Sequence, residues 1–236
     1  MTTKKLAIVG AQELTRNNAP WNDPDCDIWV ISNWANANWC KRCNGVIEIH
    51  EPHVYRNHEK DPQYWQWLQD NQTARVIMFY PDDRVPMAEH YPLGKVSGLI
   101  ENLKVRGREA QNFASSVDYA LALAIVEQYE QIDVYGVEMA HSSEYRSQQA
   151  SFAFWVGFCA GKGINLNINC TQGLFIKPLY GTFGNADGDL DSYIEGITQQ
   201  LNETKKNVDM LEGAIGIVRQ MKSDRMEIMQ GETHEN

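Results

Sequence analysis

The stretch of residues 113–145 limits the possible folds most, because it joins a helix start, an apolar helix, a buried strand and a polar strand end. Ser115 and Ser116 stand where they can cap the helix. Residues 132–135 then have the pattern of a short buried strand, which ends at Gly136. Polar residues follow directly. In open α/β sheets the carboxyl ends of parallel strands are where ligands bind, so this stretch predicts a ligand site.

Other apolar runs in the chain also have the length of strands. They cover residues 5–9, 27–32, 46–49, 75–79 and 164–168. Helical spacing appears between them, around residues 61–68 and 146–160. The alternation of strand and helix predicts an α/β fold with a mostly parallel sheet and helices on both faces. The last strand alternates apolar residues with asparagine, which is typical of a sheet edge.

Residues 80–112 contain repeated proline and glycine and lack strong periodicity. We expect a long irregular excursion there, with at most one short helix around residues 99–103. Long loops of this kind often act as lids.

The region from residue 190 onward has a different pattern, with apolar residues at helical spacing among polar and charged ones. We therefore expect a Rossmann-like α/β domain at 1–183 and an amphipathic helical arm with a mobile tail at 184–236. Gly213 and Gly216 could divide the arm into a helix pair. Its apolar stripe either packs on the parent domain or pairs with another subunit, which would give a homo-oligomer.

Composition excludes several classes of function. The formal net charge is −10, so nucleic acid is an unlikely partner and a small metabolite or a protein is favoured. The five cysteines and the lack of an apolar N-terminal run indicate neither secretion nor a disulfide framework, so we expect a cytoplasmic protein. No segment approaches the roughly 20 apolar residues that span a bilayer, which predicts no membrane insertion.

Several polar residues are candidates for nucleotide binding. The first turn contains Gly10 and Gln12, but it has a single glycine, so the dinucleotide fingerprint and the P-loop are both absent. Asn33 follows the second strand and could bond to a ribose or base, or simply form the turn. Beyond Gly136, Glu138 could bind ribose hydroxyls or a metal. Tyr145 and Arg146 could contact phosphate oxygens.

Three histidines are candidates for proton transfer. His50 leaves a predicted strand directly, and Glu51 and His53 follow it. His141 lies just beyond the strand of the opening stretch. Histidine titrates near neutral pH, and strand ends in this fold face the crevice, so His50, His53 and His141 are the predicted acid/base residues. The alternative is that each is a hydrogen-bonded structural histidine.

Two patterns superficially suggest metal sites. Cys40 and Cys43 form C-x-x-C upstream of two histidines, but the spacing is wrong for a zinc finger. The aspartates of residues 187–191 lack the glycine and glutamate of a calcium loop, and helix capping explains them better. We therefore predict no resident metal site, although a divalent metal could still accompany a nucleotide substrate.

The stretch SSVDYALALAIVEQYEQIDVYGVEMAHSSEY resembles the equivalent helix, strand and strand end of bacterial sialyltransferases that use a CMP-sugar donor. It is also similar to the MptE-like hydroxymethylpterin diphosphokinases of the same Rossmann-like group. IVGAQEL, DIWVISN and GINLNINCTQGLF extend the resemblance in patches over residues 6–175. VIEIHEPHVY, YGVEMAHSSEYRSQ and KPLYG in addition look like uncharacterised proteins of tailed phages.

The resemblance implies roles for matched residues. Asn33 and Ser115 match positions that touch the nucleotide in the sialyltransferases, and Tyr145 matches a tyrosine that holds the donor phosphate. The chain departs from that family in its first turn, which lacks Asn-Gly-Pro-Ser, and at Ala140, where a second tyrosine is expected. It also lacks the insertion that carries the family's catalytic histidine. The matches imply nucleotide binding more directly than sialyl transfer.

Two functional hypotheses follow. The first is a group transferase, for glycosyl or diphosphoryl transfer, that takes a nucleotide or nucleotide sugar as substrate at the carboxyl edge of the sheet. The second is a non-catalytic phage interaction or assembly protein with a vestigial pocket and a helical oligomerisation arm.

Overall fold

The computed structural model describes residues 3–109, 112–138, 143–169 and 186–231. Contacts divide the chain into two compact units, Met1–Ile176 and Lys177–Asn236. The predicted domain boundary after residue 183 falls outside the described residues and stays a prediction.

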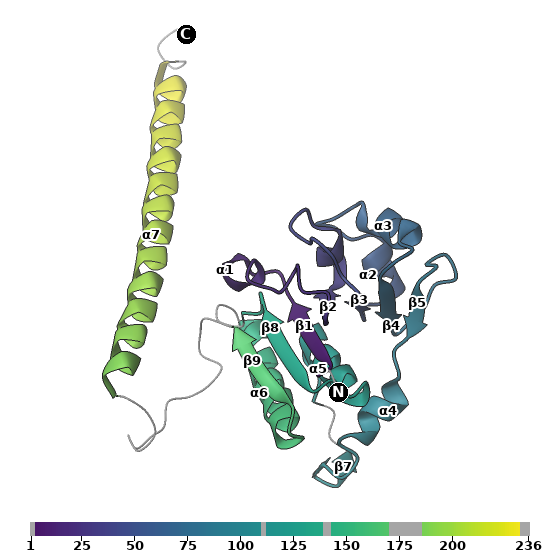
Figure 1. Ribbon diagram of the computed structural model, residues 1–236. Coiled ribbons are helices and arrows are strands. Elements are labelled where there is room, and N and C mark those ends of the chain that lie inside the picture. The colour runs from purple at the N-terminus through teal and green to yellow at the C-terminus, as the bar shows by residue number, and fades with distance from the viewer. Residues whose placement is uncertain (1–2, 110–111, 139–142, 170–185, 232–236) are drawn as a thin grey trace. The chain divides into compact units, whose positions relative to one another are not determined.

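The first unit is built on a sheet of seven parallel strands (Figure 1). In chain order they are β1 (Lys5–Val9), β2 (Cys26–Ile31), β3 (Gly45–Glu48), β4 (Arg75–Met78), β5 (Ala88–His90), β8 (Gln131–Tyr135) and β9 (Asn165–Asn169). Their order across the sheet is β5-β4-β3-β2-β1-β8-β9. The order therefore reverses at β1, which lies between β2 and β8, and such a reversal is where ligands bind in sheets of this kind.

Helices cover both faces of the sheet. They are α1 (Glu13–Arg16), α2 (Pro52–Arg56), α3 (Tyr64–Asp70), α4 (Leu93–Gly98), α5 (Ser116–Val126) and α6 (Ser143–Gly161). Successive strand residues point to opposite faces, so Leu6 and Ile8 pack in one core with α5 and α6, while Ala7 and Val9 pack in the other with α2 and α3. The predicted α/β fold with helices on both faces is confirmed.

Helix α5 lies against the sheet because almost none of its surface is polar. Its residues from Ala120 to Ala124 are all at most 1% exposed, and the helix packs against β1, β2 and β3. At its start, Ser115 and Asp118 form a capping box, in which the Ser115 backbone N–H donates to Asp118 Oδ2 at 2.8 Å. The capping serine predicted from the sequence thus begins the helix, and its first turn is fixed at the strand-end side of the sheet.

The excursion of residues 80–112 contains more regular structure than its composition predicts. It holds the edge strand β5, the helix α4 and a hairpin of β6 (Lys104–Val105) and β7 (Arg108–Glu109). The short helix lies at Leu93–Gly98, not around residues 99–103. Strand β5 has no apolar run. Backbone hydrogen bonds next to its pairing with β4 help to hold it there, such as the bond from the Tyr91 N–H to the Met78 carbonyl at 2.7 Å.

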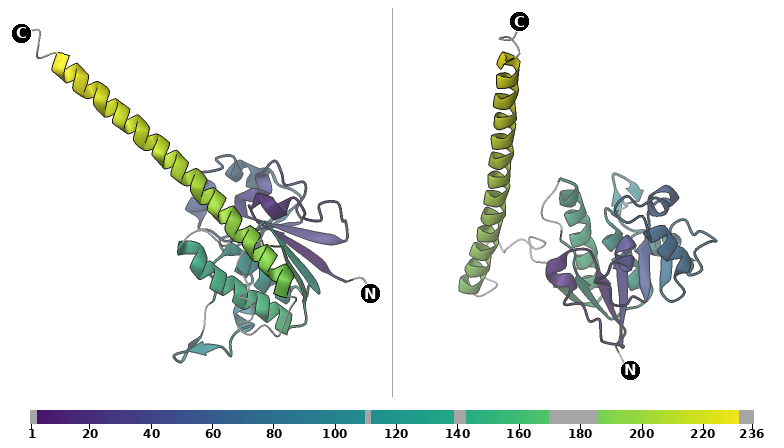
Figure 2. Two further views of the ribbon diagram at one scale, coloured as in Figure 1. Left: turned by 90° about the vertical axis from the view of Figure 1, so that its left-hand side faces the viewer. Right: turned by 90° about the horizontal axis from the view of Figure 1, so that it is seen from above.

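The second unit contains one continuous helix, α7 (Ala186–Gly231), drawn without a break in both views of Figure 2. Gly213 and Gly216 lie inside it, so the expected division into a helix pair does not occur. Among the described residues, none of the helices is both long enough and apolar enough to cross a bilayer.

Candidate functional site

A cavity of about 460 Å³ opens at the carboxyl ends of β1, β2, β3 and β8. That volume lies within the range of small-molecule sites. Its polar lining residues are His50, Ser115, Ser116, Glu138 and Gln148. Its apolar and aromatic walls come from Ile31, Trp34, Ile49, Phe113, Val117, Tyr119 and Val137. The chain thus places a cavity of nucleotide-compatible size at the point where the strand order reverses.

Two glycines lie in close contact where the loops after β1 and β8 meet in this cavity. The Gly10 N–H donates to the Tyr135 carbonyl at 2.9 Å, and the Gln12 N–H donates to the Gly136 carbonyl at 2.8 Å. A Cβ on Gly10 would lie 2.5 Å from the Gly136 oxygen, and Gly136 itself has a left-handed φ of +63°. Glycine is therefore required at both positions, because a side chain would push the two loops apart.

The first turn of α5 faces the same cavity. Ser115, Ser116 and Val117 line it, and the first backbone N–H groups of a helix have no partner within the helix. They carry the positive end of the helix dipole and form a general binding site for anions such as phosphate. The Asp118 carboxylate, which is fully buried, accepts N–H bonds from Ala114 and Ser115 at 2.8 Å each and so fixes the approach to the helix.

His50 is held by a buried carboxylate. Its Nδ1 lies 2.7 Å from Glu48 Oε1, and its backbone N–H donates to the same oxygen at 3.1 Å. Glu48 is 0% exposed, at the end of β3, whereas the His50 side chain is 42% exposed and lines the cavity. With Nδ1 engaged, Nε2 is the ring nitrogen left to exchange a proton with a ligand.

The contact between Glu48 and His50 shifts the pKa of both side chains. The hydrogen bond to Glu48 raises the pKa of His50 above its ordinary value, against the opposing effect of burial. Burial acts to raise the pKa of Glu48, but the His50 ring and the hydroxyls of Ser32 and Tyr64 outweigh it and lower that pKa. A carboxylate that orients a histidine and stabilises its protonated form is a recurrent arrangement in acid/base catalysis.

A second layer of hydroxyl groups holds Glu48 in place. Ser32 Oγ donates to Glu48 Oε2 at 2.6 Å, and the Tyr64 hydroxyl donates to the same oxygen at 2.8 Å. Ser32 has a φ of 48°, an uncommon conformation for serine, in the 3-10 helix Ser32–Asn36 that follows β2. Backbone strain of this kind concentrates at functional sites, and here it brings a hydroxyl onto the buried carboxylate.

Aromatic rings form the walls of the cavity. Phe113 and Tyr119 stack with centroids 4.4 Å apart and an interplanar angle of 14°. Trp34 lines the cavity and stacks on Trp39 with centroids 6.2 Å apart. An aromatic face of this kind can hold a base or a sugar ring.

Glu138 adds a carboxylate, an acidic side chain, to the cavity that the basic side chain of His50 also lines. Gln12 Nε2 donates to Glu138 Oε2 at 2.7 Å, which adds a side-chain link between the loops after β1 and β8. Among the described residues that line the cavity, His50 is the one side chain that can carry a positive charge. The positive charge that faces a bound phosphate would therefore come from the N-terminal end of α5 and, once it is protonated, from His50.

The predicted site residues separate into groups. Gly10, His50, Ser115, Ser116, Gly136 and Glu138 all line the cavity, and Gln12 contacts it through Glu138. Asn33 is buried in the 3-10 helix and does not line the cavity. His53 is exposed beside Glu51, 3.3 Å from its carboxylate, and borders a different cavity. His141 lies outside the described residues, and the side chains of Tyr145 and Arg146, at the start of α6, are likewise not described.

Sequence reasoning missed Glu48. A signal was present, because Glu48 and His50 are two residues apart at the end of one strand and so share a face. Trp34, which the sequence analysis did not single out, both packs on Trp39 and lines the cavity.

Metal ligands do not cluster in the part of the chain that the structure describes: no three His, Cys, Asp or Glu side chains come together. Cys40 and Cys43 are free thiols, and residues 187–191 lie in the first turns of α7.

Protein-family models and curated protein sequences give no match to this chain. Solved structures do. The sialyltransferase CstII from Campylobacter jejuni with cytidine-5'-monophosphate is 15% identical, with a TM-score of 0.45, over 80% of this chain and 100% of that one. The same enzyme with CMP-3FNeuAc is 14% identical, with a TM-score of 0.46, over 80% and 99%. The alpha-2,3-sialyltransferase from Campylobacter jejuni in apo form is 12% identical, with a TM-score of 0.43, over 84% and 95%.

The sialyltransferase resemblance found in the sequence thus has a counterpart among solved structures. The resemblances to pterin diphosphokinases and to phage proteins are not tested by them. At such identities and TM-scores a match says nothing about the ligand or reaction of this chain, so both must be inferred from the cavity itself.

Proposed function

We propose that this protein is a group transferase that binds a nucleotide or nucleotide sugar at the carboxyl edge of its sheet. The observation that carries the proposal is His50, which a fully buried Glu48 holds at 2.7 Å, in the same cavity as the first turn of α5. An acid/base group and an anion-binding helix end in one cavity are two elements that support group transfer from a phosphate ester.

The lining residues suggest how the donor is held. The phosphate would accept bonds from the backbone N–H groups at Ser116 and Val117, where the helix dipole favours negative charge. The base or sugar would lie against Trp34 or Tyr119, and Glu138 would accept bonds from ribose hydroxyls. Tyr145 and Arg146 remain candidates for further phosphate contacts from α6.

The chemistry assigned to His50 is proton transfer. Neutral His50 donates its Nδ1–H to Glu48 and accepts the proton of the acceptor hydroxyl on Nε2. The acceptor oxygen forms a bond to the transferred group as that group's bond to the phosphate oxygen breaks, and the nucleotide leaves with the electron pair. Glu48 stabilises the imidazolium that results. For diphosphoryl transfer the attacked atom is phosphorus, and the role of His50 is the same.

The test is a donor-consumption assay. Purified protein is incubated with a panel of CMP-, UDP- and GDP-sugars and nucleoside triphosphates, with and without Mg²⁺, and nucleotide release is followed by phosphorus NMR. We expect one class of donor to be consumed, and His50→Gln to slow its consumption by about 10²-fold to 10⁴-fold, the usual contribution of acid/base catalysis.

The matched control is His53→Gln, since His53 is an exposed histidine outside the cavity. It should consume the donor at the wild-type rate. Equal loss in both variants, or no effect of His50→Gln on a measurable rate, would contradict the assignment of His50.

A further inference from the structure

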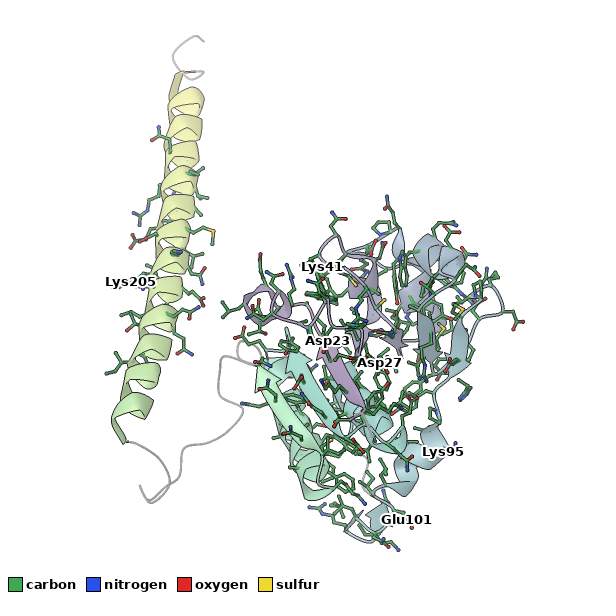
Figure 3. The ribbon with its side chains drawn as sticks, viewed as in Figure 1. Asp23, Asp27, Lys41, Lys95, Glu101 and Lys205 are labelled. Carbon is green, nitrogen blue, oxygen red and sulfur yellow. The ribbon has the colours of Figure 1, made fainter. Side chains whose placement is uncertain are left out.

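Helix α7 carries one continuous stripe of large apolar side chains that are open to solvent. Its members follow one another at alternating spacings of three and four residues, and all but one threonine are apolar: Ile194, Ile197, Leu201, Thr204, Val208, Leu211, Ile215 and Val218. The apolar members are between 47% and 64% exposed. Figure 3 shows side chains standing out along the helix, among which Lys205 is labelled. Exposed apolar stripes of this extent mark interaction surfaces.

The spacing identifies the kind of partner. Strict alternation of three and four places these residues at positions a and d of successive heptads, which is the seam of a coiled coil. The seam runs from Ile194 to Val218, roughly 36 Å at the rise of an α-helix. It ends at Lys222, which occupies the next a position. Heptads sustained over this length indicate a coiled coil. A helix that packs on a globular domain has a wider apolar stripe than this a/d seam.

The helix also needs a partner for its own stability. Gly196, Gly213 and Gly216 all lie in its interior, and glycine is among the weakest helix formers. Helices in proteins owe most of their stability to the packing of an apolar face. Packing along the stripe would therefore stabilise the whole of α7.

Thr204 does not interrupt the seam. Its hydroxyl donates to the Gln200 carbonyl of the preceding turn at 2.8 Å, so it can be buried without losing a hydrogen bond. Its methyl group remains available for the partner helix.

We propose that α7 joins three copies of this chain in a parallel, in-register coiled coil. A copy of the same helix presents the same spacing and the same seam length, so each a and d layer meets its own equivalent. The residue types favour more than two strands, because β-branched residues occupy d at Ile197 and Val218 as well as a at Ile194, Val208 and Ile215, whereas two-stranded coils prefer leucine at d, which occurs only at Leu211. Three strands is the smallest such assembly.

The flanking residues and the symmetry agree with this arrangement. In parallel strands each g residue faces the e residue five positions later on its neighbour, which pairs Gln200 with Lys205 and Asn207 with Glu212. Neither of these contacts joins two charged side chains, so like charges do not meet there. Three identical chains related by a cyclic axis must also run parallel.

The test is the molar mass of the full chain by light scattering during size-exclusion chromatography. We expect three times the chain mass of 26.9 kDa. A monomer would overturn the coiled coil, including the case where the stripe packs on its own chain, and a dimer or tetramer would overturn the three-stranded form.

Two isoleucines provide a matched pair of variants. Ile215 lies in the seam and is 51% exposed, whereas Ile217 lies outside it at position c and is 64% exposed. Ile215→Glu should shift the mass to that of a monomer with the first unit still folded by circular dichroism. Ile217→Glu should keep the trimer mass. Dissociation by both variants, or by neither, would contradict the proposed seam.

Discussion

The Nδ1 atom of His50 lies 2.7 Å from Oε1 of Glu48, which makes a partly exposed histidine the outer member of a buried acid/base pair. Both residues come from the end of β3, so their relationship depends on one strand and on the hydroxyls of Ser32 and Tyr64 that hold the carboxylate. The pair is the feature of the cavity whose properties can be measured without knowing the ligand.

Replacing the carboxylate should lower the proton affinity of the ring. In Glu48→Gln the pKa of His50 should fall below its wild-type value, because the hydrogen bond and charge that raise it are lost or weakened. The measurement is a pH titration of the histidine ring resonances by NMR. The matched control is Glu51→Gln at the exposed Glu51–His53 pair, which should leave the His50 titration unchanged. An unchanged His50 pKa in Glu48→Gln would contradict the pairing.

The Glu48→Gln variant should also change how the free energy of unfolding depends on pH. His50 has a raised folded pKa, so its contribution is complete below about pH 6.5 and is lost as pH rises through that folded pKa. Glu48 has a lowered folded pKa, so its contribution is present above about pH 4.3 and is lost as pH falls below about 4.3 through that lower folded pKa. We expect Glu48→Gln to cost about 2 kcal/mol near pH 5.5 and less near pH 9, by chemical denaturation. A cost that grows with pH would reverse the assigned signs.

The two glycines at the centre of the cavity should not tolerate a methyl group. Gly136→Ala places a Cβ 2.6 Å from the Gly10 oxygen at a φ of +63°, so we expect a loss of at least about 2 kcal/mol in the free energy of unfolding. Gly94→Ala is the control, because a Cβ there has open space around it within α4. It should be neutral or slightly stabilising. Equal stability of the two variants would mean that the loops after β1 and β8 are not in contact.

Cysteine reactivity should follow burial. Burial raises the pKa of Cys159 to about 12 and that of Cys26 to about 11, so neither forms a thiolate readily near neutral pH. A hydrogen bond from Cys43 lowers the pKa of Cys40. In native protein treated with iodoacetamide, mass spectrometry should find Cys40 labelled well before Cys26 and Cys159. Labelling of Cys159 as fast as Cys40 would show that the α6 side of the sheet opens.

The fold was predictable wherever a strand is buried on both faces. The central strands are apolar runs ended by glycine or a polar residue. In a chain that alternates strand and helix, such runs are typical of buried parallel strands. Strand β5 and the hairpin of β6 and β7 were missed because they are at most three residues long and mostly polar, so backbone pairing forms them without an apolar pattern.

The candidate site was predictable where one segment contains the signal. Ser115 as a helix cap, and Gly136 and His50 as strand ends, follow from local sequence and come together at one edge of the sheet. The hydrogen bonds that hold Glu48 were not predictable, because Tyr64 reaches it from a helix sixteen residues away in the chain and Ser32 reaches it from another strand end. The sequence pattern of one segment does not indicate which distant segments it contacts.

The central claim is that this cavity binds a nucleotide. The most direct measurement is a calorimetric titration of the full chain with nucleotides and nucleotide sugars, repeated on Ala114→Trp, which fills the cavity from an exposed lining position, and on Ala160→Trp, an exposed alanine on α6 outside the lining. We predict that at least one nucleotide binds the wild type and Ala160→Trp with equal affinity and that Ala114→Trp weakens binding at least about tenfold, or 1.4 kcal/mol. Failure of every nucleotide to bind at millimolar concentration, or equal binding by Ala114→Trp, would contradict the account.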